Sequence, residues 1–300
     1  MKKILIIACL ILLGGCSAKS VETSFFAMDT YMSISLSGTD EDALAAEEEI
    51  KRLDMLLKYD SINMSEAETE LLAEKSYEIS RFTDGAFDIT VAPVMELWGF
   101  RDKNYRVPEE REIKEALKTV GYNKISQGTK YDFGAIGKGY AGDKVSEILK
   151  KRSVKSGILS LGGNVHAIGT KPDGSLWKVG IQNPDREGYV GYVKVSDKAV
   201  VTSGGYERYF ENDGRKYSHI INPKTGCPVE NDVKSVTVIC ESGALADALS
   251  TAFFVMGSEE TQGLCRSSGN KFNDTGFSVI IIKTDGEILT IGNTEFEKVR

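Results

Sequence analysis

The spacing of apolar residues along the first half of the chain predicts a strand followed by two helices. Loose alternation of apolar and polar residues over residues 25–36 predicts the strand. Apolar residues recur at helical spacing over residues 40–58, which predicts the first helix. Ser65 followed by Glu68 matches a capping box, so we expect a second helix to begin there.

Turn residues and short apolar runs predict the remaining elements. Thr83-Asp84-Gly85 predicts a turn, and Pro108 and Gly121 bracket a further helix. From about residue 157 the pattern changes to short β-rich runs, which occupy residues 157–161, 177–181, 189–195, 199–202, 234–240 and 277–283. Two helices interrupt these runs, at residues 244–256 and 259–268.

The order of these elements predicts the fold class. Strands and helices do not alternate regularly, so we expect an α+β fold with largely antiparallel or mixed sheets. The helix-rich N-terminal half and the strand-rich C-terminal half should form two intimately packed subdomains that share a cleft.

The first residues have the pattern of a secretion signal. Met1-Lys2-Lys3 is basic, and residues 4–13 carry no charge over a length too short to span a bilayer as a helix. Leu13-Gly14-Gly15-Cys16 resembles a bacterial lipobox, in which the cysteine is lipidated and becomes the mature N-terminus. An ordinary signal peptide that happens to contain Cys16 is the alternative.

This reading divides the chain into three parts. We expect residues 1–15 to be a lipoprotein signal peptide, residues 16–24 a lipidated tether, and residues 25–300 a single domain of two subdomains. Acyl chains on Cys16 would anchor the protein stably, because each buried CH₂ contributes about 0.8 kcal/mol. The expected location is therefore the extracytoplasmic face of the bacterial cell membrane.

Composition and charge exclude some classes of function. The formal net charge is −7, so there is no electrostatic reason to expect nucleic acid as a partner. An anionic ligand would need local cations or a metal ion. Cys227, Cys240 and Cys265 have no CxxC spacing and predict neither a disulfide framework nor a zinc site. We expect them to be mostly buried, small apolar residues.

A glycine-rich loop at residues 132–140 is the first candidate site. Its glycines let the backbone approach a ligand closely, and the helix expected after it offers free N–H groups to an anion. Lys138 adds a positive charge at the same place. The loop lacks the spacing of a P-loop or a GxGxxG fingerprint, and plain turn formation explains its glycines as well.

Asp247 and Thr251 form a second candidate, because a separation of four puts them on one face of a helix. Carboxylate and hydroxyl oxygens are hard ligands of the kind that Mg²⁺ takes together with water and substrate phosphate. The alternative is a buried Thr that bonds its own helix and an Asp near the helix start.

The chain contains two histidines, and their surroundings differ. His166 follows a Gly-Gly-Asn turn and is expected to be a strand or turn residue rather than a catalyst. His219 precedes the Asn222-Pro223 turn. It is either structural or the base that is available near neutral pH.

Eight segments together resemble the ApbE-type FMN transferase family, in family order and from about residue 25 nearly to the C-terminus. They are residues 27–30 (AMDT), 84–93 (DGAFDITVAP), 97–100 (LWGF), 132–140 (DFGAIGKGY), 161–164 (LGGN), 202–209 (TSGGYERY), 217–226 (YSHIINPKTG) and 246–251 (ADALST). Any one of these segments alone would be a weak signal, and their order gives the resemblance its specificity.

The resemblance implies a flavin site between the two halves of the chain. Met28 would pack on the isoalloxazine ring, Tyr59 would be the flavin-contacting aromatic residue, and Asp132 and Lys138 would contact FAD. The same pocket would be lined by Ala86, Phe87 and Asp88. Mg²⁺ would be held by the Ala135 carbonyl, Asp247 and Thr251. His219 would stand beside the phosphate under attack and act as the catalytic base.

The activity implied is Mg²⁺-dependent transfer of FMN from FAD to a Thr or Ser hydroxyl of another protein, with release of AMP. In the family the acceptor segment resembles Asp-x-x-Ser/Thr-Gly/Ser-Ala/Ser-Thr, and we expect the acceptor to be a membrane-associated electron-transfer protein. A Mg²⁺-dependent FAD pyrophosphatase and a flavin-binding lipoprotein without turnover are the alternatives. Two departures bear on this choice: residues 59–63 pass straight into the next helix, and Ser250 stands where some relatives carry a further metal-ligand Asp.

Overall fold

A computed structural model of the chain describes residues 20–59, 62–185 and 187–299. The predicted signal peptide and Cys16 lie outside the described residues. The helical elements are α1 (Asp40–Leu56), α2 (Ala67–Phe82), the 3₁₀ turn η2 (Ile89–Val91), α3 (Ala92–Leu97), α4 (Glu110–Ala116), α5 (Gly137–Lys151) and α6 (Gly243–Ser268). The strands are β1 (Ser20–Ala27), β2 (Thr30–Ser37), β3 (Ser156–Leu161), β4 (Asn164–Gly169), β5 (Trp177–Gln182), β6 (Tyr189–Val195), β7 (Ala199–Gly204), β8 (Tyr209–Asn212), β9 (Arg215–Ser218), β10 (Ile221–Asn222), β11 (Cys227–Pro228), β12 (Val233–Cys240), β13 (Lys271–Phe272), β14 (Thr275–Lys283), β15 (Ile288–Ile291) and β16 (Phe296–Lys298).

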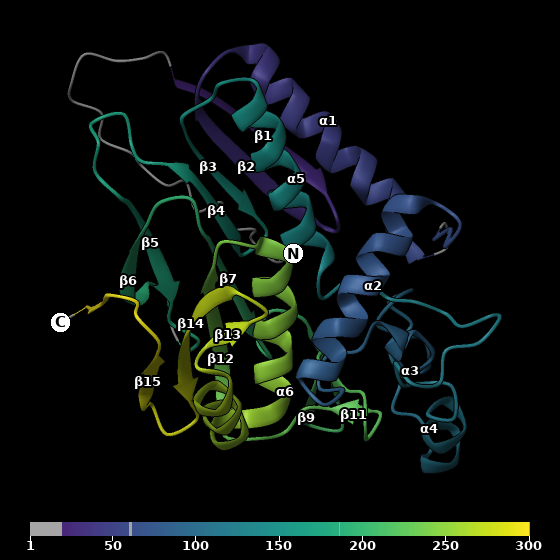
Figure 1. Cartoon of the computed structure of the whole chain (residues 1–300). Helices are drawn as coiled ribbons and strands as arrows, with labels where there is room; N and C mark the ends of the chain where they lie inside the picture. The colour runs from purple at the N-terminus through teal and green to yellow at the C-terminus, as the bar shows by residue number, and fades with distance from the viewer. Residues whose placement is uncertain (1–19, 60–61, 186, 300) are drawn as a thin grey trace.

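A nine-stranded sheet forms the centre of the molecule (Figure 1). Its strands follow the order β1-β2-β3-β4-β7-β12-β14-β13, and β15 pairs with β14. The strands pair antiparallel, as in the contact of β2 with β3, where Ile34 lies opposite Leu159. Since β2 comes from the N-terminal half of the chain and β3 from the C-terminal half, the two halves share one continuous sheet.

Helices cover one face of this sheet, and a second sheet covers part of the other. Helix α1 packs against β1 and α5, and α6 packs against α5, β7 and β12. On the opposite face, the three-stranded sheet β16-β6-β5 contributes Trp177, Val179 and Val193 to a separate apolar cluster. That cluster includes buried residues of β4, β7, β12 and β14 but none of β1 or β2 among the described residues.

A smaller aromatic cluster lies where α3 and α4 meet the hairpin of β8 and β9. Trp98, Phe210 and Tyr217 pack there, with ring centroids of Phe210 and Tyr217 5.1 Å apart. The indole N–H of Trp98 donates to the carbonyl of Gly226 at 2.8 Å and joins the N-terminal half to the β10–β11 turn.

The structure confirms the α+β class and most of the predicted elements. The helices expected at residues 244–256 and 259–268 are present as α6, which is interrupted at Gly257 by a non-helical φ of 82° and ψ of 178°. Cys240 and Cys265 are buried free thiols, and Cys227 is half-buried. Among the described helices, none combines the length and the apolar character needed to cross a membrane.

Three local predictions were wrong. Residues 25–36 form two strands rather than one, because the chain reverses at Met28 and Asp29. The paired hairpin begins at Ser20, so residues 20–24, expected to be tether, belong to β1. The capping box is also absent: Glu66 is the N-cap of α2, and the Ser65 hydroxyl donates to Asn63 instead.

Candidate active site

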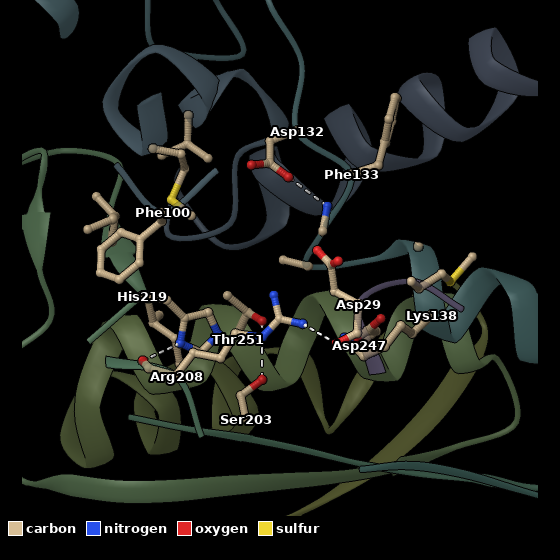
Figure 2. A pocket seen from close by; sticks show the side chains of 18 of the residues that line it. Asp29, Phe100, Asp132, Phe133, Lys138, Ser203, Arg208, His219, Asp247 and Thr251 are labelled. Carbon is tan, nitrogen blue, oxygen red and sulfur yellow. Dashed lines mark hydrogen bonds between the residues drawn. The ribbon is translucent and has the colours of Figure 1, made fainter. Parts of the chain in front are cut away.

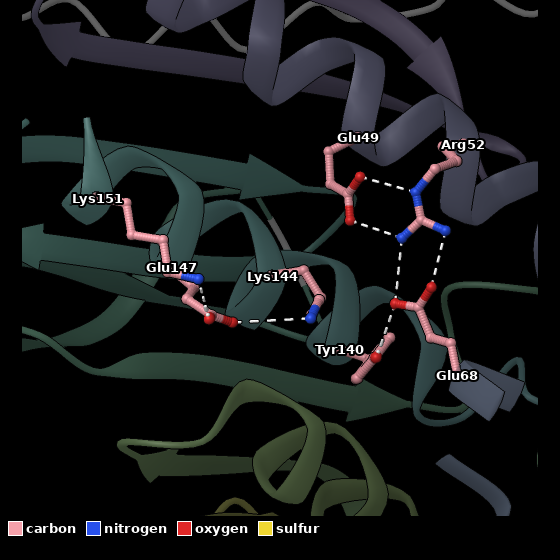
Figure 3. A network of polar contacts seen from close by, with 7 residues as sticks. All are labelled: Glu49, Arg52, Glu68, Tyr140, Lys144, Glu147 and Lys151. Carbon is pink, nitrogen blue, oxygen red and sulfur yellow. Dashed lines mark hydrogen bonds and ion pairs between the residues drawn. The ribbon is translucent and has the colours of Figure 1, made fainter. Parts of the chain in front are cut away.

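A cavity of about 1040 Å³ opens at the end of the large sheet, and both halves of the chain line it. Its walls include the β1–β2 turn, the segment after α2, the loop before α5, the end of β7 and the first turns of α6. The structure brings all the predicted site residues of the domain together in these walls, namely Met28, Tyr59, Ala86, Phe87, Asp88, Asp132, Ala135, Lys138, His219, Asp247 and Thr251. Figure 2 shows several of them facing one another across this space.

Met28 reaches the cavity from a strained turn. Met28 and Asp29 have φ values of 48° and 60°, as in the mirror-image turns that close two-residue hairpins. Such turns usually contain Gly or Asn, because a longer side chain is disfavoured at positive φ. Arg208 donates to the carbonyl of Asp29 at 3.4 Å, and Gly162 packs directly against Thr30. These contacts hold the turn in place, and strain held in this way is typical of a ligand site.

The Asp88 carboxylate is fully used in fixing its own segment. One oxygen accepts from the backbone N–H and the hydroxyl of Thr90, at 2.8 and 2.7 Å. The other accepts from the backbone N–H of Tyr122 at 2.7 Å. Asp88 therefore shapes this wall of the cavity, together with the buried Ala86 and Phe87 beside it.

Asp132 lies in a polar cluster that the sequence alone did not reveal. Its carboxylate forms an ion pair with Arg101 at 2.8 Å and accepts from the N–H of Gly134 at 2.8 Å. The guanidinium carbon of Arg101 lies 3.1 Å from the centroid of the Tyr59 ring, and the Tyr59 hydroxyl donates to Glu96. Arg101 therefore connects two predicted flavin contacts, Tyr59 and Asp132, and fixes their spacing.

The glycine-rich loop runs directly into α5, as predicted, and a carboxylate from another helix meets it there. The backbone N–H of Gly139 donates to Oδ2 of Asp247 at 2.8 Å. A Cβ at Gly139 would lie 2.1 Å from the carbonyl oxygen of Gly243 and 2.7 Å from Cβ of Asp247. Only glycine permits this approach of α5 to α6, which places Asp247 beside the Ala135 segment.

Asp247 and Thr251 present oxygen atoms to the cavity from one face of α6. Asp247 is 3 % exposed, and among the described residues no donor is found for its second oxygen, Oδ1. The described residues contain no cluster of three or more His, Cys, Asp and Glu side chains suited to a metal. One buried carboxylate with a hydroxyl and a carbonyl is nevertheless a donor set that suits Mg²⁺, which keeps water and substrate phosphate as its other ligands.

A chain of hydroxyl groups orients Thr251. The Ser250 hydroxyl donates to the backbone carbonyl of Asp247 at 2.9 Å, which uses its single hydrogen. Ser203, at 2.8 Å from Ser250, must then be the donor in their contact, and Thr251 must donate to Ser203 at 3.2 Å. The lone pairs of the Thr251 hydroxyl therefore remain available to a cation in the cavity.

His219 is a neutral imidazole, and its hydrogen bond shows which ring nitrogen carries the hydrogen. Its Nδ1 lies 3.0 Å from the carbonyl oxygen of Arg208, and since a carbonyl only accepts, Nδ1 carries the hydrogen (Figure 2). Burial lowers the pKa of His219 to about 4, and the nearby charges of Arg208 and Lys138 add to this effect. At pH 7 the lone pair is on Nε2, the arrangement that a general base requires.

Two residues of opposite charge, Lys138 and Glu207, line the cavity, and the sequence gave no reason to assign a role to Glu207. Lys138, on the first turn of α5, is half-buried in the wall. Glu207 follows β7, also lines the cavity, and has an exposed side chain. Desolvation raises the pKa of Glu207 to about 7, although Lys138 and Arg208 act in the other direction.

His166 has no part in the cavity. It is a buried strand residue of β4, as expected, and it fills a notch between Gly142 and Gly243. The signal that could have separated the two histidines is the glycine pair, which leaves room for a ring between α5 and the start of α6.

Comparisons with known proteins show which family the chain belongs to. The model of the ApbE family matches residues 28–273. A relative from Klebsiella pneumoniae (strain 342), named FAD:protein FMN transferase, is 33% identical over 195 residues, which are 60% of this chain and 60% of that protein. A protein of the same name from Vibrio cholerae serotype O1 is 31% identical over 244 residues, covering 77% of this chain and 71% of that protein. The alignment thus spans less than two thirds of the Klebsiella relative.

The fold is similar to that of solved structures over nearly the whole chain. The crystal structure of the ApbE protein from Thermotoga maritima superposes with a TM-score of 0.82 at 34% sequence identity. The match covers 90% of this chain and 96% of that chain. All the residues that line the cavity, from Met28 to Thr251, lie within residues 28–273, which the family model matches.

Proposed function

The chain belongs to the ApbE family, and we propose that, like the relatives it resembles, it is a FAD:protein FMN transferase. In this proposal FMN passes from FAD to a Thr or Ser hydroxyl of another protein, AMP is released, and Mg²⁺ is required. The observation that carries it is one cavity that holds a neutral His219, the cation Lys138 and the oxygens of Asp247 and Thr251.

The size and lining of the cavity support FAD as its ligand. Its volume of about 1040 Å³ is at the upper end of the range for ligand pockets, as expected for a dinucleotide. Met28, Ala86 and Phe87 provide apolar surface for the isoalloxazine ring, and Tyr59 stands beside them. Asp132 and Arg101 form the polar wall next to Tyr59.

The pyrophosphate of FAD needs positive charge in a chain whose net charge is −7. Lys138, on the first turn of α5, supplies part of it. The Ala135 carbonyl, Asp247 and Thr251 would hold Mg²⁺, which when bound neutralises charge on the phosphate oxygens. The buried Asp247 carboxylate with a free oxygen, and the donor direction imposed on Thr251, both fit a cation at this position.

His219 has the protonation state needed to activate a hydroxyl. In the proposed reaction the acceptor oxygen attacks the phosphorus of the FMN half of FAD, and the bond from that phosphorus to the oxygen of the AMP phosphate breaks. The hydroxyl proton passes to Nε2 of His219, while the hydrogen bond from Nδ1 to Arg208 keeps the ring in orientation. Lys138 stabilises the charge that develops on the leaving phosphate.

Incubation of the protein with FAD, Mg²⁺ and a peptide that carries the acceptor segment tests the proposal. Mass spectrometry should show a peptide heavier by FMN less water, together with free AMP. Free FMN and AMP with an unmodified peptide would instead show a pyrophosphatase, in which water is the nucleophile. Unchanged FAD in the presence of Mg²⁺ would show a flavin-binding protein and contradict the proposal.

The proposed location is the extracytoplasmic face of the membrane, with Cys16 lipidated. A membrane-associated electron-transfer protein as acceptor is consistent with that location. The lipobox-like residues 13–16 support this part of the proposal, and they lie outside the described residues.

A further inference from the structure

The outer face of the β1–β2 hairpin carries two large aromatic side chains that are exposed to solvent. Phe26 is 58 % exposed and Tyr31 is 68 % exposed. They lie opposite each other in the strand register, and their rings meet edge to face with centroids 5.4 Å apart. The other positions on this face are small or polar: Ser20, Glu22, Ser24, Ser33, Ser35 and Ser37.

Within residues 20–59, 62–185 and 187–299, no other element covers this pair. The second sheet packs on the same face of the large sheet, because Ile158 of β3, which pairs with Ser35, contacts it. That contact ends at β3, so the hairpin beyond it faces solvent. An exposed aromatic pair on an otherwise polar face is typical of an interaction site.

The position of the pair relates it to the cavity. Phe26 and Tyr31 flank the turn formed by Met28 and Asp29, and Met28, Asp29 and Thr30 line the cavity. Phe26 and Tyr31 are not part of the cavity lining, so their exposed surface faces bulk solvent just outside it. The turn between them is therefore part of the cavity rim.

We propose that Phe26 and Tyr31 form a docking site for the acceptor protein, and that they bind an apolar side chain of the folded acceptor outside the seven-residue segment that carries its reactive hydroxyl. The inference rests on the proposed function, because a transferase that modifies a protein must admit a polypeptide at the rim of its cavity. Aromatic residues commonly provide the dominant contacts in such interfaces.

The strained turn makes this site suitable for positioning. Met28 and Asp29 are held at positive φ by the contact of Arg208 with Asp29 and of Gly162 with Thr30. The aromatic pair is therefore fixed relative to the cavity wall. An acceptor protein seated on the pair would place its hydroxyl at a defined distance from the bound FAD.

The two ends of the hairpin favour an acceptor protein, rather than a lipid surface, as the partner of Phe26 and Tyr31. The hairpin register pairs Ser20 with Ser37 at one end and Ala27 with Thr30 at the other. Phe26 and Tyr31 lie at the end that reaches the cavity, whereas the segment that leads to Cys16 joins at the opposite end.

The experiment uses the full chain with Phe26→Thr and Tyr31→Thr combined, because threonine removes both rings and retains a high strand propensity. Leu71→Ala, which removes an exposed apolar side chain on α2, is the matched control. The acceptors are a folded protein that carries the Asp-x-x-Ser/Thr-Gly/Ser-Ala/Ser-Thr segment and the free seven-residue peptide. FMN incorporation, the Kd for FAD and the melting temperature are measured for each variant.

The double variant should raise the KM for the folded acceptor roughly tenfold or more, the usual scale for losing an aromatic hot spot. Its kcat, its Kd for FAD and its rate with the free peptide should stay near those of the wild type. An unchanged KM for the folded acceptor overturns the docking site, and so does a parallel loss of FAD affinity, since the pair would then act through the turn. The docking site is also overturned if the double variant keeps a normal KM for the folded acceptor but loses binding to phosphatidylglycerol vesicles. The two rings would then bind a membrane. Failure of the wild type to modify either acceptor contradicts the proposed function itself, and is thus distinguishable.

Discussion

At the scale of single residues, the tautomer of His219 decides what the side chain can do. The hydrogen bond from Nδ1 to the Arg208 carbonyl leaves Nε2 as an acceptor, and the lowered pKa keeps it unprotonated at pH 7. A base of this kind acts on the acceptor hydroxyl and adds little to the binding of FAD. The two contributions can therefore be separated by mutation.

We expect His219→Ala to bind FAD within a few-fold of the wild type and to transfer FMN roughly 10²–10⁴ times more slowly, the usual loss on removing a general base. His219→Asn should not restore the rate, because an amide cannot take a proton at pH 7. Single-turnover rates and the Kd for FAD provide the measurement. A purely structural role predicts the reverse pattern, in which thermal stability and FAD affinity fall while the rate at saturating FAD stays normal.

Glu207 should make FAD binding depend on pH. Its pKa of about 7 means that the side chain becomes anionic as the pH rises through neutrality, and the anion repels the FAD pyrophosphate. In buffer without Mg²⁺, the affinity for FAD should therefore fall as the pH is raised from 6 to 8. Glu207→Gln retains the neutral form, so its Kd should change little over this range. The same pH dependence in both proteins would show that another group is responsible.

The oxygens of α6 provide a test of the metal site. Asp247→Ala should abolish Mg²⁺-dependent turnover, since it removes the buried carboxylate from the donor set. Ser203→Ala should have a smaller effect, a several-fold rise in the Mg²⁺ concentration for half-maximal rate, because Thr251 loses the acceptor that orients it. The assay is the rate as a function of Mg²⁺ concentration. Wild-type rates at limiting Mg²⁺ in Asp247→Ala would place the metal elsewhere.

At the scale of elements, the approach of α5 to α6 determines the geometry of the site. Gly139 lies so close to the carbonyl of Gly243 that Gly139→Ala requires the two helices to separate. We expect a loss of about 1–3 kcal/mol in the free energy of unfolding, as for other overpacked sites, and weaker Mg²⁺ dependence. Gly263→Ala is the control: it lies on α6 with open space around it, and should stabilise the helix by up to about 1 kcal/mol. Denaturant unfolding measures the free energy of unfolding of both variants. An equal increase in both would show that α5 and α6 can separate without cost.

The elements also show where sequence reasoning succeeds and where it fails. Helix α1 and strand β6 were predicted closely, because apolar periodicity reports the face that each element buries. The β1–β2 hairpin was missed because its turn uses Met28 and Asp29, which have no sequence signal for positive φ. That turn is stabilised by Arg208 and Gly162, which are distant in sequence, so no local pattern encodes it.

The same reasoning applies to the site. Asp247 and Thr251 were predicted because a separation of four on one helix is a local pattern. Lys138 and His219 were singled out from their own segments, and the family resemblance supplied the remaining predicted residues. Arg101 and Glu207 were not given roles, since their significance comes from neighbours that tertiary folding supplies, namely Asp132 and Lys138.

At the scale of the whole molecule, the continuous sheet explains how distant motifs share one cavity. Strand β2 pairs with β3, although about 120 residues separate them in sequence, and this pairing places the β1–β2 turn beside Gly162. The contact from the Trp98 indole to the Gly226 carbonyl fixes α3 against the β10–β11 turn on the opposite side. The walls of the cavity are therefore tied by the same contacts that stabilise the fold.

The N-terminal segment should determine which acceptors the cavity can reach. Met28 lies twelve positions after Cys16, and a fully extended chain spans at most about 3.3–3.6 Å per residue. If Cys16 is lipidated, the rim of the cavity then lies within roughly 40 Å of the membrane surface. Such a distance favours acceptors that are themselves membrane-associated, because both partners are confined to one layer.

We therefore expect Cys16→Ala to yield protein without a lipid that no longer fractionates with membranes. Because the substitution lies outside the catalytic cavity, the purified variant should modify a soluble acceptor peptide at the wild-type rate. With an acceptor reconstituted in vesicles, its rate at low enzyme concentration should fall, since the local concentration that the anchor provides is lost. Subcellular fractionation and FMN incorporation in both formats measure these effects. Retention of Cys16→Ala on membranes through a mild salt wash would show that the protein is held there by something other than a lipid on this cysteine.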